Sequence, residues 1–220
     1  MVGIEIDLSP GVPMHMKQFA ALSFALAAGA ASASVIHVQT GTYTGPGLFS
    51  DPASFQTTVE GAIAAPGATS TWASSYDSLG ATINNGALKS TIVFDAATAG
   101  ADWTFRAGVD FGKGGAIYLD GVLEQSFSHD MWWAGSYSTP GQYFQFTADD
   151  LGAGYHTLTL YGLEDCCSGN HQTQYQIGAS GFTSFGASDG LPAVPEAQGY
   201  AMLLAGLGLV ATLAHRRKQA

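Results

Sequence analysis

The only two cysteines of the chain, Cys166 and Cys167, are neighbours. Consecutive Cα atoms lie about 3.8 Å apart across a trans peptide, below the roughly 4.4–6.8 Å that disulfides usually span. A bridge between them would close a strained ring and lock one turn, while restraining almost none of the unfolded chain. We expect a Cys166–Cys167 disulfide in an oxidising compartment, with two free thiols as the alternative. A zinc site would need two more Cys or His ligands, which His171 alone does not supply.

Aromatic side chains are concentrated in the segment HDMWW, residues 129–133. Trp and Tyr rings have flat apolar faces and polar tips, and a sugar ring could stack on such a face. We therefore name Trp132, Trp133, Tyr137 and His171 as candidate ligand-binding residues. The alternative is that both tryptophans pack beneath their own loop.

Carboxylate and amide oxygens are the ligands that Ca²⁺ prefers. Asp110, Asp120, Asp165 and Asn170 are the candidate metal ligands, and Ca²⁺ is the one cofactor under consideration. We expect no catalytic site, because the H-E-x-x-H and EF-hand patterns are absent from the sequence. The alternative is an extracellular hydrolase that uses carboxylates such as Glu164 and Asp165.

The body of the chain is strongly acidic. Residues 34–194 contain three Lys or Arg residues against fourteen Asp or Glu. Such a body repels phosphate backbones, so nucleic acid is not an expected partner. The acidic, Gly/Ser/Thr-rich composition instead fits an extracellular domain that meets neutral glycans or divalent cations.

Hydrophobic and polar residues alternate over short segments of this body, as in half-buried β-strands. The clearest alternation covers residues 103–111, and Asp120-Gly121 between two apolar pairs predicts a two-residue hairpin. About seven to nine strands with Gly-rich turns predict an all-β protein, an antiparallel sandwich or jelly roll, over residues 34–191. No long helix is expected. Further strands are expected at residues 117–119, 122–123, 143–146 and 155–161, with 35–39, 90–94 and 174–178 nearer the sheet edges.

The N-terminal region has the pattern of an export signal. Lys17 supplies the positive charge of the n-region, an apolar h-region follows, and Ala33 ends an A-x-A cleavage motif. We predict a signal peptide over residues 16–33, removed by signal peptidase after Ala33. Residues 1–15 are predicted to be an extension produced by an upstream start.

The tail over residues 192–220 has three parts: a short motif at 194–197, an uncharged apolar run at 199–214 and a basic cluster at 215–218. A helix of about 16 residues spans about 24 Å, slightly less than a hydrocarbon core of about 30 Å. Positive charge after such a run keeps that end cytoplasmic. The pattern predicts a single transmembrane helix that anchors the chain before processing. The processing residues are Ala33, Val194, Pro195, Glu196, Arg216, Arg217 and Lys218.

This tail resembles the PEP-CTERM sorting signal of Gram-negative, exopolysaccharide-producing bacteria, with Ala197 in place of the second proline. The resemblance implies that a membrane protease, exosortase, cleaves near the motif after a transient stay in the inner membrane. It also implies a final location in the cell envelope or outside the cell, with exopolysaccharide as a candidate partner. The run Cys166-Cys167-Ser168-Gly169 is similar to the CCXG family of PEP-CTERM proteins, whose name brings no biochemical activity.

Two other segments are similar to the PA14-type β-sandwich of adhesins and glycosidase modules: FRAGVDFGKGGAIYLDG, residues 105–121, and GAGYHTLTLYG, residues 152–162. The resemblance implies that some glycan-binding members hold Ca²⁺ with a double Asp beside a bridged cysteine pair. This chain has Asp110-Phe111 where the double Asp is expected.

Together these patterns predict an exported, exosortase-processed surface or matrix protein. Its non-catalytic β-sandwich would bind glycans or Ca²⁺ in adhesion or in an exopolysaccharide biofilm matrix. Besides the hydrolase, a redox-sensitive matrix protein in which the cysteine pair opens and closes stays an open alternative.

Overall fold

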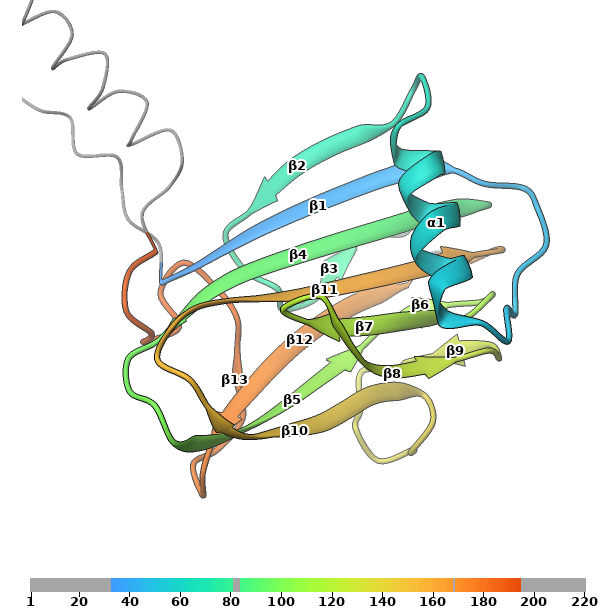
Figure 1. The fold of residues 1–220 in the computed structure, drawn as a ribbon. Helices are drawn as coiled ribbons and strands as arrows, with labels where there is room; N and C mark the ends of the chain where they lie inside the picture. The colour runs from blue at the N-terminus through green and yellow to red at the C-terminus, as the bar shows by residue number, and fades with distance from the viewer. Residues whose placement is uncertain (1–32, 81–83, 168, 195–220) are drawn as a thin grey trace, which may run out of the picture.

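The computed structural model describes residues 33–80, 84–167 and 169–194, which form two antiparallel β-sheets packed face to face (Figure 1). The first sheet has six strands in the order β2-β1-β4-β11-β7-β8. The strand bounds are β1 (Ser34–Thr42), β2 (Thr69–Ala73), β4 (Gly86–Ala96), β7 (Gly115–Leu119), β8 (Val122–Phe127) and β11 (Gly154–Glu164).

The second sheet has the order β10-β5-β12-β13, with the short strand β3 also paired to β12. A separate two-stranded ribbon, β6 with β9, follows β5 and carries part of the aromatic segment. The strand bounds are β3 (Leu79–Gly80), β5 (Ala101–Gly108), β6 (Asp110–Phe111), β9 (Met131–Trp132), β10 (Tyr143–Leu151), β12 (Asn170–Ile177) and β13 (Thr183–Ser184). The expected antiparallel all-β architecture is confirmed.

Aromatic side chains fill the space between the two sheets. The ring of Phe94 on β4 lies 5.6 Å from that of Phe105 on β5 and 5.4 Å from that of Phe185, measured between centroids. Successive side chains of a strand point to opposite faces, which explains why alternate residues of β4 and β5 are buried. Each fully buried large apolar side chain stabilises the fold by about 1.5–3 kcal/mol relative to an exposed one.

One helix, α1 (Pro52–Ile63), covers part of the outer face of the six-stranded sheet (Figure 1). Asp51 caps its N-terminus, and Pro52 stands at the first helical position, where its missing N–H costs nothing. A stripe of Phe55, Val59 and Ala62 is buried. The helix is an addition to the elements expected from the sequence, and its stripe completes a smaller apolar cluster with Ala87, Ala116, Tyr118, Tyr161 and Leu163.

The strands β2, β3, β9 and β13 were not expected, and the expected strands differ from the structure in two respects. The continuous strand expected over residues 103–111 is interrupted at Val109, so its last two residues leave the main sheet and form β6. The segments expected near the edges form β1, β4 and β12, each of which pairs on both sides. The Asp120-Gly121 hairpin is confirmed, and both residues have the positive φ that a type I′ turn requires.

The export signals fall largely outside the described residues. Of the predicted processing residues, Ala33 and Val194 are described, and both are buried. The signal peptide apart from Ala33, the extension at 1–15 and the apolar run at 199–214 lie outside, as do Pro195, Glu196, Arg216, Arg217 and Lys218. Within the described part of the chain, no helix is long and apolar enough to cross a membrane.

Gly162 on β11 lies directly against the ring of Phe111, and a Cβ at Gly162 would come within 2.3 Å of ring carbons. We expect Gly162→Ala to lower the free energy of unfolding by about 1–3 kcal/mol, as overpacked core positions do. The matched control is Gly61→Ala on α1, where nothing lies within 4 Å of the added Cβ. The control should raise stability by about 0.5–1 kcal/mol. Denaturant titration measures both variants, and an unchanged midpoint for Gly162→Ala would contradict the packing.

Candidate functional site

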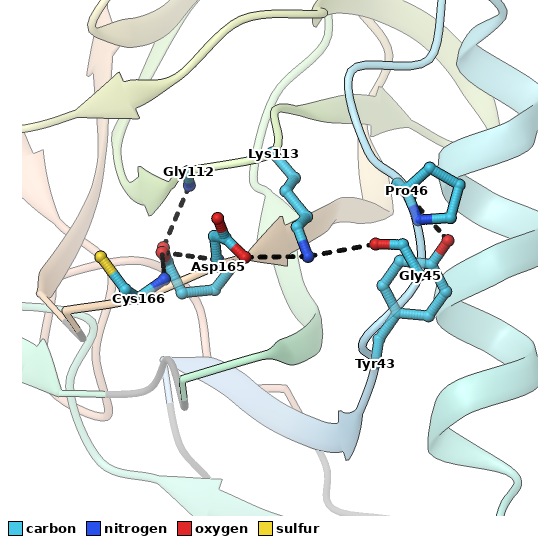
Figure 2. Close-up of polar contacts among 8 residues, drawn as sticks. Tyr43, Gly45, Pro46, Gly112, Lys113, Asp165 and Cys166 are labelled. Carbon is cyan, nitrogen blue, oxygen red and sulfur yellow. Dashed lines mark hydrogen bonds and ion pairs between the residues drawn. The ribbon is translucent and has the colours of Figure 1, made fainter.

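The turn that carries the two cysteines is held by a buried carboxylate. Glu164, the last residue of β11, is 2% exposed and accepts hydrogen bonds from three backbone N–H groups (Figure 2). Its Oε1 receives Asp165 N at 2.8 Å and Cys166 N at 3.0 Å, and its Oε2 receives Gly112 N at 3.1 Å. Burial raises the pKa of Glu164, an effect that these donors oppose. The carboxylate therefore ties the start of the cysteine turn to the turn between β6 and β7.

Lys113 adds a second link to the same turn (Figure 2). Its Nζ lies 3.1 Å from Asp165 Oδ1 and donates to the carbonyl oxygen of Gly45, also at 3.1 Å. The Tyr43 ring lies near the same ammonium, 5.8 Å from Nζ to the ring centroid. The segment after β1 and the turn after β11 are thus joined through one cation.

Both cysteines are exposed free thiols in the structure. Cys167 has a φ of 68°, in the left-handed region that few non-glycine residues adopt. The hydrogen bond with Cys167, together with nearby negative charge, raises the pKa of Cys166 to about 11. Since the thiolate is the reactive form, Cys166 is poorly suited to nucleophilic chemistry near neutral pH. The Cys166–Cys167 disulfide stays a prediction for the oxidised protein.

Asp110 lies beneath the end of the cysteine turn. It is 5% exposed, and Gly169 sits so close that an added Cβ would come within 2.3 Å of Asp110 Oδ2. Burial and the charge of Asp130 raise the pKa of Asp110 to about 6. Asp110 pairs with Trp132 across the β6–β9 ribbon. Directly opposed residues in an antiparallel pair share one face of the ribbon, where Asp110 is covered and Trp132 is exposed.

The two tryptophan side chains differ in exposure, which neither of the two interpretations of the sequence predicted. Trp132 is 66% exposed, whereas Trp133 is 7% exposed and packs against Gly108. Trp132 stands at an open pocket of about 400 Å³, which we call the Trp132 pocket. Its wall combines apolar and polar surface, and it is lined by Asp130, Trp132, Ala134, Ser136, Ser138, Thr139 and Gln142.

Hydrogen bonds hold the backbone of the segment that carries Trp132. The side-chain amide of Gln142 accepts from Trp132 N through Oε1 and donates to the carbonyl oxygen of Asp130 through Nε2. Trp133 N donates to the carbonyl oxygen of Val109 at 3.1 Å. The loop that carries the pocket is therefore attached at several points to the ribbon beneath it.

Tyr137 is a supporting residue of the pocket. Its hydroxyl donates to the carbonyl oxygen of Gln172 at 3.1 Å, and its ring packs against Trp133. The guanidinium of Arg106 lies between the rings of Tyr137 and Phe182, 3.8 Å and 3.6 Å from their centroids. The sequence did not predict this contact, because Arg106, Tyr137 and Phe182 come from three separate parts of the chain.

His171 is fully buried, so a ligand on the surface does not reach its ring. Burial lowers the pKa of His171 to about 3, which keeps the imidazole neutral. The ring makes an edge contact with Phe111 at 5.3 Å between centroids. Of the four candidate ligand-binding residues, the structure leaves Trp132 as the exposed one, while Trp133 and His171 are core residues.

The four candidate calcium ligands do not form one site. Asp120 N donates to the carbonyl oxygen of Thr157, seven residues before Glu164 on β11, which corresponds to about 23 Å of strand. Asp165 is paired with Lys113 at the opposite end. Among the described residues, no group of three or more His, Cys, Asp or Glu side chains is placed to hold a metal ion.

His156 has a carboxylate partner that its sequence spacing did not reveal. Its Nδ1 lies 2.7 Å from Asp120 Oδ2, and its Nε2 lies 2.9 Å from the carbonyl oxygen of Gly152. Both partners are acceptors, so the pair of contacts is satisfied when the ring is doubly protonated. The contact links the β7–β8 hairpin to the turn before β11 and is remote from the Trp132 pocket.

No protein-family model matches the chain, and no curated protein matches it. A PA14 sugar-binding domain from an RTX adhesin is similar at 13% identity over 71% of this chain and 97% of that chain, with a TM-score of 0.42. A β-glucosidase from Kluyveromyces marxianus is similar at 14% identity over 63% of this chain and 17% of that chain, with a TM-score of 0.39. A family 35 carbohydrate binding module from an environmental isolate is similar at 17% identity over 44% of this chain and 70% of that chain, with a TM-score of 0.25. TM-scores below 0.5 support no conclusion about function.

The His156 contact predicts a pH-dependent contribution to stability. Burial lowers the pKa of His156, but the hydrogen bonds to Asp120 and to the Gly152 carbonyl outweigh it, so the pKa lies above its usual value. A raised folded-state pKa stabilises the fold below the unfolded-state pKa of about 6.5, and this stabilisation disappears as pH rises through the folded-state pKa.

We therefore expect His156→Gln to lower the free energy of unfolding more below about pH 6 than above about pH 9. Urea titrations at several pH values measure the difference. In an Asp120→Asn background the effect of His156→Gln should lose most of this pH dependence. If His156→Gln lowered the free energy of unfolding equally at every pH in the parent background, the raised pKa of His156 would be contradicted.

Proposed function

We propose that this chain is a non-catalytic carbohydrate-binding β-sandwich and that the Trp132 pocket is its binding site. The observation that carries the proposal is a 66% exposed indole beside a pocket of hydroxyl and amide groups. A pyranose ring has an apolar face that can cover the indole and hydroxyl groups that hydrogen-bond to side chains such as Ser136, Ser138 and Gln142.

The support beneath the pocket favours binding to a preformed surface. Trp133 and Tyr137 are packed beneath the loop, and Arg106 is fixed between two rings. A surface that is already ordered loses less conformational freedom when it binds, so more of the contact energy contributes to affinity. The loop could therefore bind a sugar with a modest contact area.

A second candidate, an extracellular hydrolase, has one observation in its favour. Asp110 and Glu164 are carboxylates with raised pKa values, and the charge of Asp110 contributes to the raised pKa of Glu164. Both are almost completely buried, and Glu164 is occupied by three backbone donors. Asp165, the other predicted acid, is paired with Lys113. A structural role accounts better for these contacts than contact with a substrate does.

The binding proposal is tested with Trp132→Ala on a glycan array, followed by calorimetric titration of the best ligand. Loss of the stacking surface should weaken binding about tenfold or more, which corresponds to about 1.4 kcal/mol. Trp72→Ala is the matched control, because Trp72 is 61% exposed but lies on the edge strand β2. The Trp72→Ala variant should bind the glycan with the same affinity as the parent chain. Equal effects of the two substitutions, or no glycan bound by the parent chain, would reject the proposal.

We also propose that the chain is exported and processed by signal peptidase and exosortase, and that it acts in the cell envelope or the surrounding matrix. The support is the sequence pattern of residues 16–33 and 192–220. The acidic, lysine-poor body between them suits contact with uncharged or cationic matrix polymers.

The export proposal is tested by fractionating cells that carry a tagged chain, with and without an exosortase. The released form should have lost residues up to Ala33 and the apolar tail after the 194–197 motif, and intact mass identifies both cuts. Without the exosortase the protein should stay with the membrane fraction. A released form that keeps residues 199–214 would contradict the exosortase step.

A further inference from the structure

The Trp132 pocket has a negative charge that its own lining does not neutralise. Asp130 is the charged residue among the lining side chains. Asp110 lies on the same face of the ribbon as Trp132, and the Asp130 charge disfavours its ionisation. A cation in the pocket would therefore be attracted to Asp130, and the negative charge of the buried Asp110 nearby would add to this attraction.

The basic residues of the described chain are engaged elsewhere. Lys89 is paired with Glu60 on α1 at 2.6 Å, and Lys113 is paired with Asp165. Arg106 lies between two aromatic rings and donates through Nε to Gln174 Oε1 at 2.6 Å. Within residues 33–80, 84–167 and 169–194, ion pairs form at sites other than Asp110 and Asp130.

The histidine nearest to the pocket belongs to another set of contacts. His129 Nε2 lies 2.8 Å from the carbonyl oxygen of Gly141, and its ring packs on Phe127. It is not among the residues that line the pocket. The described residues also lack a cluster of three or more metal-ligating side chains. A compensating positive charge would therefore come with the ligand.

We infer that the Trp132 pocket selects an amino sugar with a protonated amine over neutral and acidic sugars. The inference rests on the proposed carbohydrate binding and names the ligand class of the same site. The sugar ring covers the face of Trp132, where a cation is attracted by the π-system, and the ammonium group points to Asp130. A uronic acid would bring a second carboxylate next to that of Asp130, and an N-acetylated sugar would leave the charge of Asp130 unbalanced.

The test compares three oligosaccharides of equal length by calorimetry on the full chain: oligomers of glucosamine, of N-acetylglucosamine and of galacturonic acid. At a pH where the sugar amine is protonated, the glucosamine oligomer should bind at least about tenfold more tightly than the N-acetylated one, a difference of about 1.4 kcal/mol. The preference should decrease when salt is added or the amine is neutralised.

Asp130→Asn is the decisive variant because it removes the charge while keeping the shape of the side chain. It should abolish the preference for glucosamine and leave the affinity for the N-acetylated oligomer unchanged. Asp149→Asn on β10 is the matched control, since Asp149 is exposed and outside the pocket. The control should behave like the parent.

The other outcomes separate this inference from the binding proposal. Equal, Trp132-dependent binding of the amino and N-acetylated oligomers would overturn the charge selection and leave carbohydrate binding intact. Tighter binding of the galacturonate oligomer, or binding that needs added Ca²⁺ in place of the amine, would also overturn it. Absence of binding by all three oligomers and across the glycan array would reject both proposals.

Discussion

The close packing of Phe111 against the backbone of β11 is the contact on which the site depends. Its ring lies against Gly162 and Gly115, and neither position has room for a side chain. This contact fixes the short strand β6, which has left the main sheet. Because residues alternate along a strand, burying Phe111 in the core turns Asp110 to the opposite face. The pairing of β6 with β9 then places Trp132 beside Asp110. A two-residue ribbon thereby acquires a defined position.

The three basic residues of the described chain act as links between elements that are distant in sequence. Lys89 joins β4 to α1, Lys113 joins the turn before β7 to the segment after β1 and to Asp165, and Arg106 joins β5 to two aromatic rings. With so few cations, and each one engaged, most carboxylates are left without a basic partner. The low content of basic residues is thus connected to the acidic character of the Trp132 pocket, and it favours ligands that are uncharged or cationic.

The sequence indicated which residue types form the candidate site, but not which of their side chains are exposed or in contact. The clustering of aromatic residues at 129–133 pointed to the segment that borders the Trp132 pocket, yet Trp132 at the end of β9 is exposed while Trp133, just after β9, packs inward. His156 and Asp120 are 36 residues apart, so their contact follows from the pairing of β7 with β11. The helix α1 carried a local signal, since Asp51-Pro52 is a capping pattern and Phe55, Val59 and Ala62 recur at helical spacing. The strand-rich surroundings masked it.

The sequence by itself determined the longer strands, the Asp120-Gly121 hairpin, the antiparallel class and the acidic character of the body. Each of these follows from local alternation, turn chemistry or composition, which need no knowledge of distant contacts. Tertiary structure alone decided that Glu164 is a buried acceptor for three N–H groups and that His171 is a core residue. It also decided that Asp120 and Asp165 lie at opposite ends of β11. Whether a polar side chain is buried, and which partners it has, depends on the strands that pack around it. The packing of the two sheets against each other decides which strands these are.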